Sequence, residues 1–365
     1  MMKAKTQTYL FLVITACILS IIPAHNVVNN KDLFNNPSMM DNVKNLYNMD
    51  LVEGMISNIS YSAGISTDSN NVLIGKDDWL FLGNVNNKTL DVKRFGITED
   101  KRKELNDAHS AAIQWKDYLL NNGVKDFKIL IGPDKDTIYK DELPKWDAHA
   151  SPSVIELLLS ENKDIYVDAL TDLIKEREST NKPLYFKTDS HWNFYGGSVA
   201  FNKLADSMKD SGIVLPSKIK QDDLSFDPGY SGDLAAFLRI KSLPDNAPAI
   251  KDNEIKNTTA TQINYETGDI LSKEKLGYVG ITMTPTRILS DNYLNDKKVL
   301  WIRDSYGTSI SPWMIRTFKD ILEVHHDMVS PTLFKKMVSD YKPDYVIFTV
   351  VERNSLVGIS KVGPY

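Results

Sequence analysis

The last third of the sequence alternates short apolar runs, typical of buried strands, with segments whose apolar residues recur at helical spacing. The strand-like runs cover residues 298–303, 321–325 and 345–351, and the helical segments follow Ser305 and cover 331–341. Strands that alternate with helices in this way form a mostly parallel sheet with helices on both faces. The pattern therefore predicts a three-layer α/β fold.

Composition narrows the class of protein further. The chain has 365 residues, of which 42% are hydrophobic and 25% charged, as in an ordinary folded protein with a sizeable core. The net charge is -5, and no block rich in lysine and arginine occurs. Nucleic-acid-binding proteins depend on such blocks, so the composition argues against a nucleic-acid partner. A neutral sugar polymer would not be repelled by this charge.

The first 25 residues predict export. A short basic start, Met1–Lys5, precedes an apolar run of 14 residues from Tyr9 to Ile22. That length fits a signal peptide better than a membrane span, which needs about 20 residues. A cleavage site flanked by small residues is missing, so an uncleaved signal-anchor is an alternative. The segment ending at Cys17 also resembles a lipoprotein signal with Cys17 as the lipidated residue; a further alternative is a buried helix of a cytosolic protein.

The remaining chain divides into a polar tether and one folded domain. Residues 26–70 are rich in Asn, Ser and Asp and predict a tether or peripheral helices, followed by a domain over 71–365. Within it, 213–296 is polar with scattered prolines, and we expect an insertion lying over the edge of the sheet. Cys17 is the only cysteine, so the folded body has neither a disulfide nor a cysteine nucleophile.

Ser305 is the candidate nucleophile. It follows the strand-like run 299–302, and Gly307 permits a tight turn directly after it. A serine at the carboxyl end of such a strand projects into the crevice where open α/β sheets bind ligands, next to the amides of the following helix. A serine hydroxyl is a weak nucleophile unless a base lies within hydrogen-bond reach. The alternative is a serine that only caps the next helix.

Asp189 and His191 supply the base. In the segment Lys187–Asn193, the His191 imidazole can accept the serine proton, and Asp189 can hold its other nitrogen. The alternatives are a surface histidine and a metal-binding pair. The cluster of His325, His326 and Asp327 could also bind a metal or line the site, but further ligands at suitable spacing are missing. We therefore predict neither a metal nor a cofactor.

At these residues the chain resembles the alginate O-acetyltransferase family of the AlgJ/AlgX type, whose SGNH-hydrolase-like domain carries Asp-x-His-Trp and a later Asp-Ser. The resemblance covers about residues 70–360 in consistent order. Besides the two motifs it rests on these elements: Ile74–Leu82, Pro133–Tyr139 with Leu143 and Pro144, Gly232–Ala235, and Val351–Asn354. The Asp/His block precedes the Ser block, which is the circularly permuted motif order of this family.

The resemblance implies roles for individual residues. Ser305 is the expected nucleophile, His191 the base and Asp189 its partner. The expected oxyanion hole includes the Ser305 amide, with Gly232 or Arg353 as a second donor. Arg303 stands where the family often has glycine before Asp-Ser, which changes the turn in front of the nucleophile.

The resemblance also implies a function. We expect an O-acetyltransferase, secreted or N-terminally anchored outside the cytosol, that acetylates hydroxyls of an exported or capsular polysaccharide through an acyl-serine. Its expected partners are the polysaccharide, a multi-spanning membrane O-acyltransferase that delivers acetyl groups, and other polysaccharide secretion proteins. The alternatives are a carbohydrate esterase that uses the same triad, and a non-catalytic glycan-binding assembly subunit.

Overall fold

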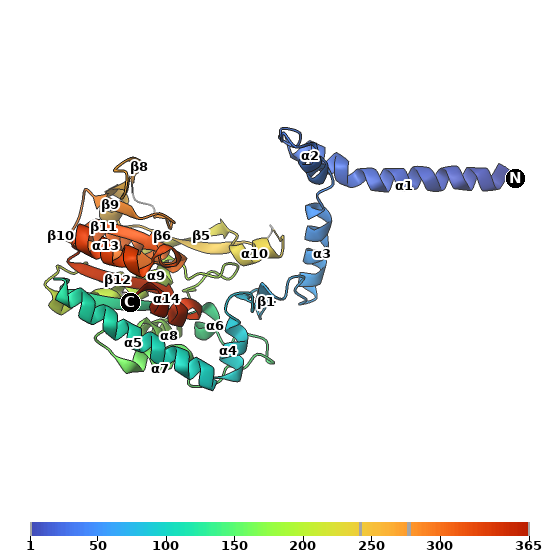
Figure 1. Cartoon of the computed structure of the whole chain (residues 1–365). Coiled ribbons are helices and arrows are strands. Elements are labelled where there is room, and N and C mark those ends of the chain that lie inside the picture. Colours follow the sequence, from blue (N-terminus) through green and yellow to red (C-terminus); the bar gives the residue numbers. More distant parts are fainter. Residues whose placement is uncertain (1, 241–242, 276–278, 364–365) are drawn as a thin grey trace. The chain divides into compact units, whose positions relative to one another are not determined.

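The computed structural model describes residues 2–240, 243–275 and 279–363 (Figure 1). The chain divides into two compact units, each of which is described by itself. The first unit takes in the chain up to Asp68 together with a short segment that begins at Ala236. The second unit holds Ser69 to Ala235 and the C-terminal part of the chain, and it contains all the predicted site residues.

The first unit is helical. It contains α1 (Met2–Asn29), α2 (Met39–Leu46) and α3 (Asp50–Ser62). Among the described helices, only α1 is long and apolar enough, over Lys5–Asn29, to cross a membrane by length and composition. The same property is found in signal sequences, so export by cleavage and export by anchoring both remain predictions. The Asn26 side chain ties the end of α1 to the second helix by donating to the carbonyl of Leu46.

The second unit is built on a sheet of eight strands, of which five are parallel. In spatial order the strands are β4 (Tyr166–Val167), β3 (Asp126–Gly132), β12 (Tyr345–Val351), β10 (Asn295–Arg303), β11 (Phe318–His325), β9 (Thr286–Ser290), β7 (Thr259–Asn264) and β8 (Ile270–Lys275). The first five pair in parallel, and the last three continue the sheet antiparallel. The predicted mostly parallel α/β sheet is confirmed.

Helices cover both faces of this sheet. One face carries α5 (Glu99–Asn121), α7 (Val154–Glu161), α13 (Pro331–Tyr341) and α14 (Ser355–Val362), and the other carries α8 (Ala169–Ser179), α9 (Phe194–Ser207) and α12 (Ser311–Thr317). Figure 1 shows α5 and α14 side by side over the first face. Shorter elements complete the unit: β1 (Val72–Ile74), β2 (Leu80–Leu82), α4 (Thr89–Phe95), α6 (Lys135–Ile138), β5 (Leu224–Tyr230), α10 (Asp233–Phe237), β6 (Asp245–Ile250) and α11 (Asn253–Asn257).

Helix α5 packs the core on its face of the sheet. The Thr98 hydroxyl caps the helix by accepting from a backbone N–H in its first turn. Its fully buried Trp115 contacts Phe127 of β3, Phe334 of α13 and Phe348 of β12 at ring-centroid distances of 5.5, 5.2 and 5.3 Å. One indole therefore joins a helix to two neighbouring strands, and truncating such a side chain costs about 3–5 kcal/mol.

Helix α9 begins at a side-chain cap and packs tightly on the opposite face. The Asn193 side chain accepts from the N–H groups of Tyr195 and Gly196. Gly196 is required by space, because a Cβ there would lie 2.3 Å from the carbonyl oxygen of Leu184. The helix ends at Ser207, and a 3-10 turn follows over Lys209–Ser211.

The segment 213–296 departs from the expected insertion over the sheet edge. Its last part supplies β7, β8 and β9, which extend the sheet instead of covering it, and β5 and β6 form a separate antiparallel pair. Antiparallel strands with one solvated face alternate apolar and polar residues, so they lack the continuous apolar run of a buried parallel strand. That is why the sequence pattern did not identify them.

A buried ion pair joins two neighbouring strands of the sheet, two positions before Ser305 on β10. Arg303 on β10 and Glu323 on β11 both have side chains with no exposed surface, and Nε lies 2.8 Å from the carboxylate. The guanidinium also donates to the carbonyls of Val279 and Gly280. Arginine is therefore accommodated where the family that the sequence resembles often has glycine, because the buried guanidinium bonds to Glu323 and to two backbone carbonyls.

Removing one member of this pair is expected to destabilise the second unit strongly. Glu323→Ala leaves the buried guanidinium without its counter-charge, which costs about 3–5 kcal/mol in the free energy of unfolding. Urea denaturation of the full chain in detergent measures this change. Glu178→Ala, at an exposed position of α8, is the control and is expected to stay within about 0.5 kcal/mol. Equal effects of the two substitutions would contradict this assignment.

Candidate active site

Ser305 lies at the carboxyl end of β10, in a turn that its neighbour Asp304 holds in place. One carboxylate oxygen of Asp304 accepts from the N–H of Tyr306 at 2.9 Å, and the other accepts from the N–H of Val351 at 2.8 Å. The turn is thereby bonded to the end of β12. The expected helix begins as a 3-10 turn over Ser305–Ile310 and continues as α12.

Two backbone amides of this turn are already engaged. The N–H of Tyr306 donates to the Asp304 side chain, and the N–H of Gly307 donates to the Asp304 carbonyl. The Ser305 N–H, which we expect from the sequence to face an oxyanion, takes part in neither of these bonds. Gly307 allows close packing, because a Cβ there would lie 2.5 Å from the Arg303 side chain.

The segment that carries Asp189 and His191 is held by a buried ammonium. The Lys135 Nζ donates to the carbonyls of Phe186, Lys187 and Asp189 at 2.9, 3.0 and 2.6 Å. Burial lowers the pKa of Lys135 to about 8, although nearby carboxylates, Asp189 first among them, oppose this shift. Because these three carbonyls fix the backbone, the Asp189 carboxylate is left to face the imidazole.

His191 joins Asp189 to Ser305 in one continuous relay. The His191 Nδ1 lies 2.7 Å from a carboxylate oxygen of Asp189, and Nε2 lies 2.7 Å from the Ser305 hydroxyl. The backbone N–H of His191 donates to the same Asp189 oxygen at 2.9 Å. The structure therefore brings together the three side chains selected from the sequence, although 114 positions separate His191 from Ser305.

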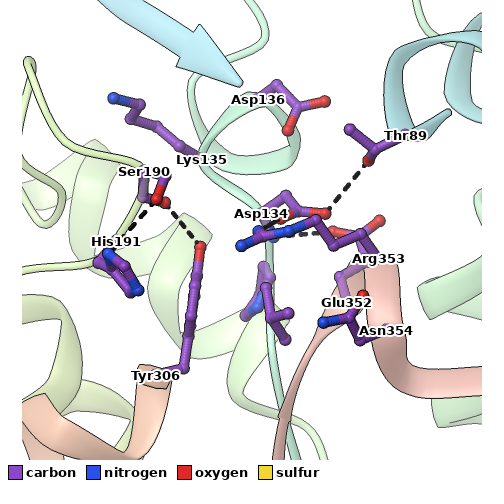
Figure 2. A network of polar contacts seen from close by, with 12 residues as sticks. Thr89, Asp134, Lys135, Asp136, Ser190, His191, Tyr306, Glu352, Arg353 and Asn354 are labelled. Carbon is purple, nitrogen blue, oxygen red and sulfur yellow. Dashed lines mark hydrogen bonds and ion pairs between the residues drawn. The ribbon is translucent and has the colours of Figure 1, made fainter. Parts of the chain in front are cut away.

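Reciprocal hydrogen bonds clamp the two segments on either side of this relay. The Trp192 indole donates to the carbonyl of Tyr306 at 2.8 Å, and the Tyr306 hydroxyl donates to the carbonyl of Ser190 at 2.9 Å. Both aromatic side chains are fully buried, and Figure 2 shows the Tyr306 ring standing beside His191. The two bonds thus join the residues next to His191 to the residue next to Ser305.

A second carboxylate, which the sequence did not single out, lies beside the imidazole. Asp233 accepts from the N–H and the hydroxyl of Ser190 at 2.7 and 2.6 Å, and its own N–H donates to Asp189. One of its oxygens lies 4.0 Å from the His191 Nδ1. The element Gly232–Ala235 was noticed in the sequence for its family likeness. The aspartate that follows Gly232 in this element was the one sequence signal that could have pointed to Asp233.

Gly232 itself lies at the site for a different reason from the expected one. Its N–H donates to the Thr188 hydroxyl at 3.0 Å, so that amide is already engaged. A Cβ at this position would lie 2.3 Å from the Cβ of Asp189. The role seen here is to let the Asp233 segment pass directly against the Asp189 segment.

Arg353 stands behind Tyr306 and is paired with a buried acid. Its guanidinium forms an ion pair with Asp134 and lies 5.6 Å from the centroid of the Tyr306 ring (Figure 2). Only 9% of the side chain is exposed. Arg353 thus packs against the Tyr306 ring and places a positive charge near the site. Among the described residues, it makes no contact with Ser305.

The electrostatic surroundings make His191 a stronger base than a free imidazole. Burial by itself disfavours the charged ring, but the hydrogen bond and the charge of Asp189, aided by Asp233, outweigh it and raise the pKa of His191. Arg353 opposes this shift. A protonated His191 is therefore stabilised at the moment when it holds the serine proton.

Two groups in the described part of the chain have ligand atoms close enough together for a metal ion. They are the Asp189, His191 and Asp233 group and the His325, His326 and Asp327 group. In the first, the His191 Nδ1 is bonded to Asp189 and Nε2 to Ser305. These hydrogen bonds account for the closeness of the His191 and Asp189 atoms in the first group.

The chain is similar to one protein family model and to several solved structures. A family model described as the SGNH hydrolase-like domain of the acetyltransferase AlgX matches residues 72–279, a range that includes His191 and ends before Ser305. PatB1 from Bacillus cereus is similar in structure, with 14% sequence identity and a TM-score of 0.58 over 80% of this chain and 99% of PatB1. A DHHW family protein from Eubacterium siraeum has 19% identity and a TM-score of 0.50, over 69% of this chain and 88% of that one.

At these identities the structural likenesses show a shared fold. No curated protein sequence matches the chain.

The position of Asp233 predicts a measurable effect on the titration of His191. The pKa of an ordinary imidazole is about 6.5, and the pKa of His191 is expected to lie above that value. Asp233→Asn removes a charge that favours the protonated ring, so the pKa should fall, and Asp189→Asn should lower it further. NMR titration of the His191 ring protons measures both shifts. Asp227→Asn, exposed on β5, is the control; a pKa that does not change in Asp233→Asn contradicts the assignment.

Proposed function

Because this chain belongs to the AlgX family of SGNH hydrolase-like acetyltransferases, we propose that it transfers acetyl groups to hydroxyls of an exported or capsular polysaccharide through an acetyl-Ser305 intermediate. The observation that carries this proposal is the relay in which His191 lies 2.7 Å from both Asp189 and Ser305. Acyl transfer needs a nucleophile, a base and a group that orients the base, and the relay supplies all three.

The first step forms the acyl-enzyme. The Ser305 oxygen attacks the carbonyl carbon of the acetyl donor while its proton passes to the His191 Nε2. Asp189 holds the resulting imidazolium through Nδ1, and the Ser305 N–H faces the oxyanion. The donor's leaving group then departs with the proton from His191, so that acetyl-Ser305 and neutral His191 remain.

The second step transfers the acetyl group to the sugar. A hydroxyl of the polysaccharide attacks the carbonyl carbon of acetyl-Ser305 and gives its proton to the His191 Nε2. The tetrahedral intermediate collapses, the Ser305 oxygen leaves, and His191 returns the proton to it. A positioned general base of this kind contributes about 10²–10⁴-fold to the rate.

The place of reaction follows from the N-terminal segment in this proposal. Residues 1–25 act as a signal peptide or signal-anchor, with lipidation of Cys17 as a further route, residues 26–70 act as a tether, and 71–365 form the acetyltransferase domain. The helix α1 supports this view, because it is long and apolar enough to cross a membrane. Outside the cytosol no acetyl-CoA is supplied, so a multi-spanning membrane O-acyltransferase is the proposed source of acetyl groups.

Substitution of the nucleophile tests the proposal. Ser305→Ala is expected to lower acetyl transfer from an activated acetyl ester to a glycan by at least about 10³-fold, because triad members act as a unit. Mass spectrometry of the intact chain with the donor alone should show one added acetyl group in the native chain and none in Ser305→Ala. Ser339→Ala, at an exposed position of α13, is the matched control and should retain full activity.

The competing reactions give different outcomes in the same assay. Transfer is favoured if acetylated glycan rises and released acetate falls as the acceptor concentration increases. Release of acetate at a rate that does not depend on the acceptor would identify an esterase instead. Full transfer activity in Ser305→Ala would overturn the proposed mechanism.

A further inference from the structure

The end of β11 carries a second cluster of titratable side chains that the relay does not use. His325 is the last residue of the strand, and His326 and Asp327 follow in a 3-10 turn. Each of the three offers a ligand atom, and these atoms all lie within 4.8 Å of one another. The cluster lies at the carboxyl edge of the sheet, because His325 pairs with Arg303, two positions before Ser305.

His326 is the unusual member of this cluster. Its side chain is only 5% exposed, yet within the described part of the chain neither ring nitrogen has a hydrogen-bond partner. Leaving a buried polar group without a partner costs about 1–3 kcal/mol, so such a group usually has a bound species that satisfies it. The neighbouring Phe348 ring, whose centroid lies 6.0 Å from that of the imidazole, offers neither a donor nor an acceptor.

The distances within the cluster are those of a metal site. Four ligands placed tetrahedrally at about 2.0–2.1 Å from a zinc ion lie about 3.4 Å from one another. One carboxylate oxygen of Asp327 lies 3.4 Å from Nδ1 of His326, and the other lies 3.7 Å from Nδ1 of His325. The centroids of the two imidazole rings lie 4.7 Å apart, with 26° between the ring planes. One ligand atom from each residue lies within 4.8 Å of the others, so side-chain rotation would bring the three atoms onto one ion.

The hydrogen bonds around the two imidazoles differ. The Nδ1 of His325 accepts a hydrogen bond from the N–H of Asp327, so a metal ion at this nitrogen would replace that bond. The His326 ring needs no such exchange, because neither of its nitrogens has a hydrogen-bond partner in the described part of the chain.

One neighbouring charge opposes a cation. Lys361 of α14 places its ammonium 3.5 Å from the Asp327 carboxylate. About half of this side chain is exposed, at 53%, so it can turn into solvent when another cation takes its place. Lys361 therefore weakens metal binding without blocking it, and its removal should strengthen binding.

We propose that His325, His326 and Asp327 bind one divalent transition-metal ion of the zinc type, with a remaining coordination position open to solvent through the exposed Asp327. Two imidazoles and one carboxylate favour Zn²⁺ or Co²⁺ over Mg²⁺ and Ca²⁺, which prefer oxygen ligands. Three protein ligands with one open position are the arrangement of sites that bind an exchangeable oxygen ligand. The site goes beyond the proposed acetyl transfer and does not depend on it.

Titration with metal ions tests the proposal. The full chain, prepared in detergent without a polyhistidine tag, is titrated with Zn²⁺ by calorimetry and with Co²⁺ by visible absorption. We expect one ion per chain. Loss of even an outer partner costs a metal site roughly 10- to 100-fold in affinity, so His325→Gln, His326→Gln and Asp327→Asn should each weaken binding by at least about tenfold. Lys361→Gln should tighten it.

Two control variants separate this site from other histidines. His109→Gln, on α5, should leave the affinity unchanged, and so should His191→Ala, which removes the rival group at the relay. Loss of binding in His191→Ala with retention in Asp327→Asn would move the ion to the relay and overturn the proposal. So would an affinity for Zn²⁺ that is the same in the native chain and in Asp327→Asn. Because Asp327 is exposed, this variant also remains informative if His326→Gln fails to fold.

Discussion

The mutual hold between Trp192 and Tyr306 sets the distance on which the rest of the site depends. Each side chain bonds to the backbone of the other segment, so the 114 positions between His191 and Ser305 are bridged on both sides of the reacting atoms. A single hydrogen bond of this type contributes only about 0.5–1.5 kcal/mol net. Its importance is geometric, since acid–base chemistry needs heavy atoms within about 3 Å before the reaction begins.

Behind this contact lies a layer of buried charges that are almost all paired. Lys93 forms ion pairs with Asp134 and Asp136, and backbone carbonyls hold the Lys135 ammonium. Arg353 forms an ion pair with Asp134 (Figure 2). Each charge would be costly if its partner were missing. These bonds fix the backbone of the Asp189 and Tyr306 segments, and the buried Asp189 carboxylate is left to bond the His191 imidazole.

The sequence predicted the parts of this molecule that have a local signal. The strands β10, β11 and β12 contain continuous apolar runs, so the sequence pattern identified them. Asp233 and Lys135 were missed because their roles arise from contacts across 44 and 54 positions, which no spacing reveals. Gly232 was expected as a donor, and its need for space beside Asp189 could not be foreseen, because that contact exists only in the folded chain.

The outermost strand, β8, bears on how the protein behaves in a crowded compartment. A terminal strand presents unpaired backbone groups, to which a strand of another molecule can add and start aggregation. The final residues of β8 are Lys273, Glu274 and Lys275, and the opposite border of the sheet is β4, with only two residues. A strand from another molecule would thus face alternating charges along β8 and almost no unpaired backbone along β4. Both features disfavour the addition of strands and growth into fibrils.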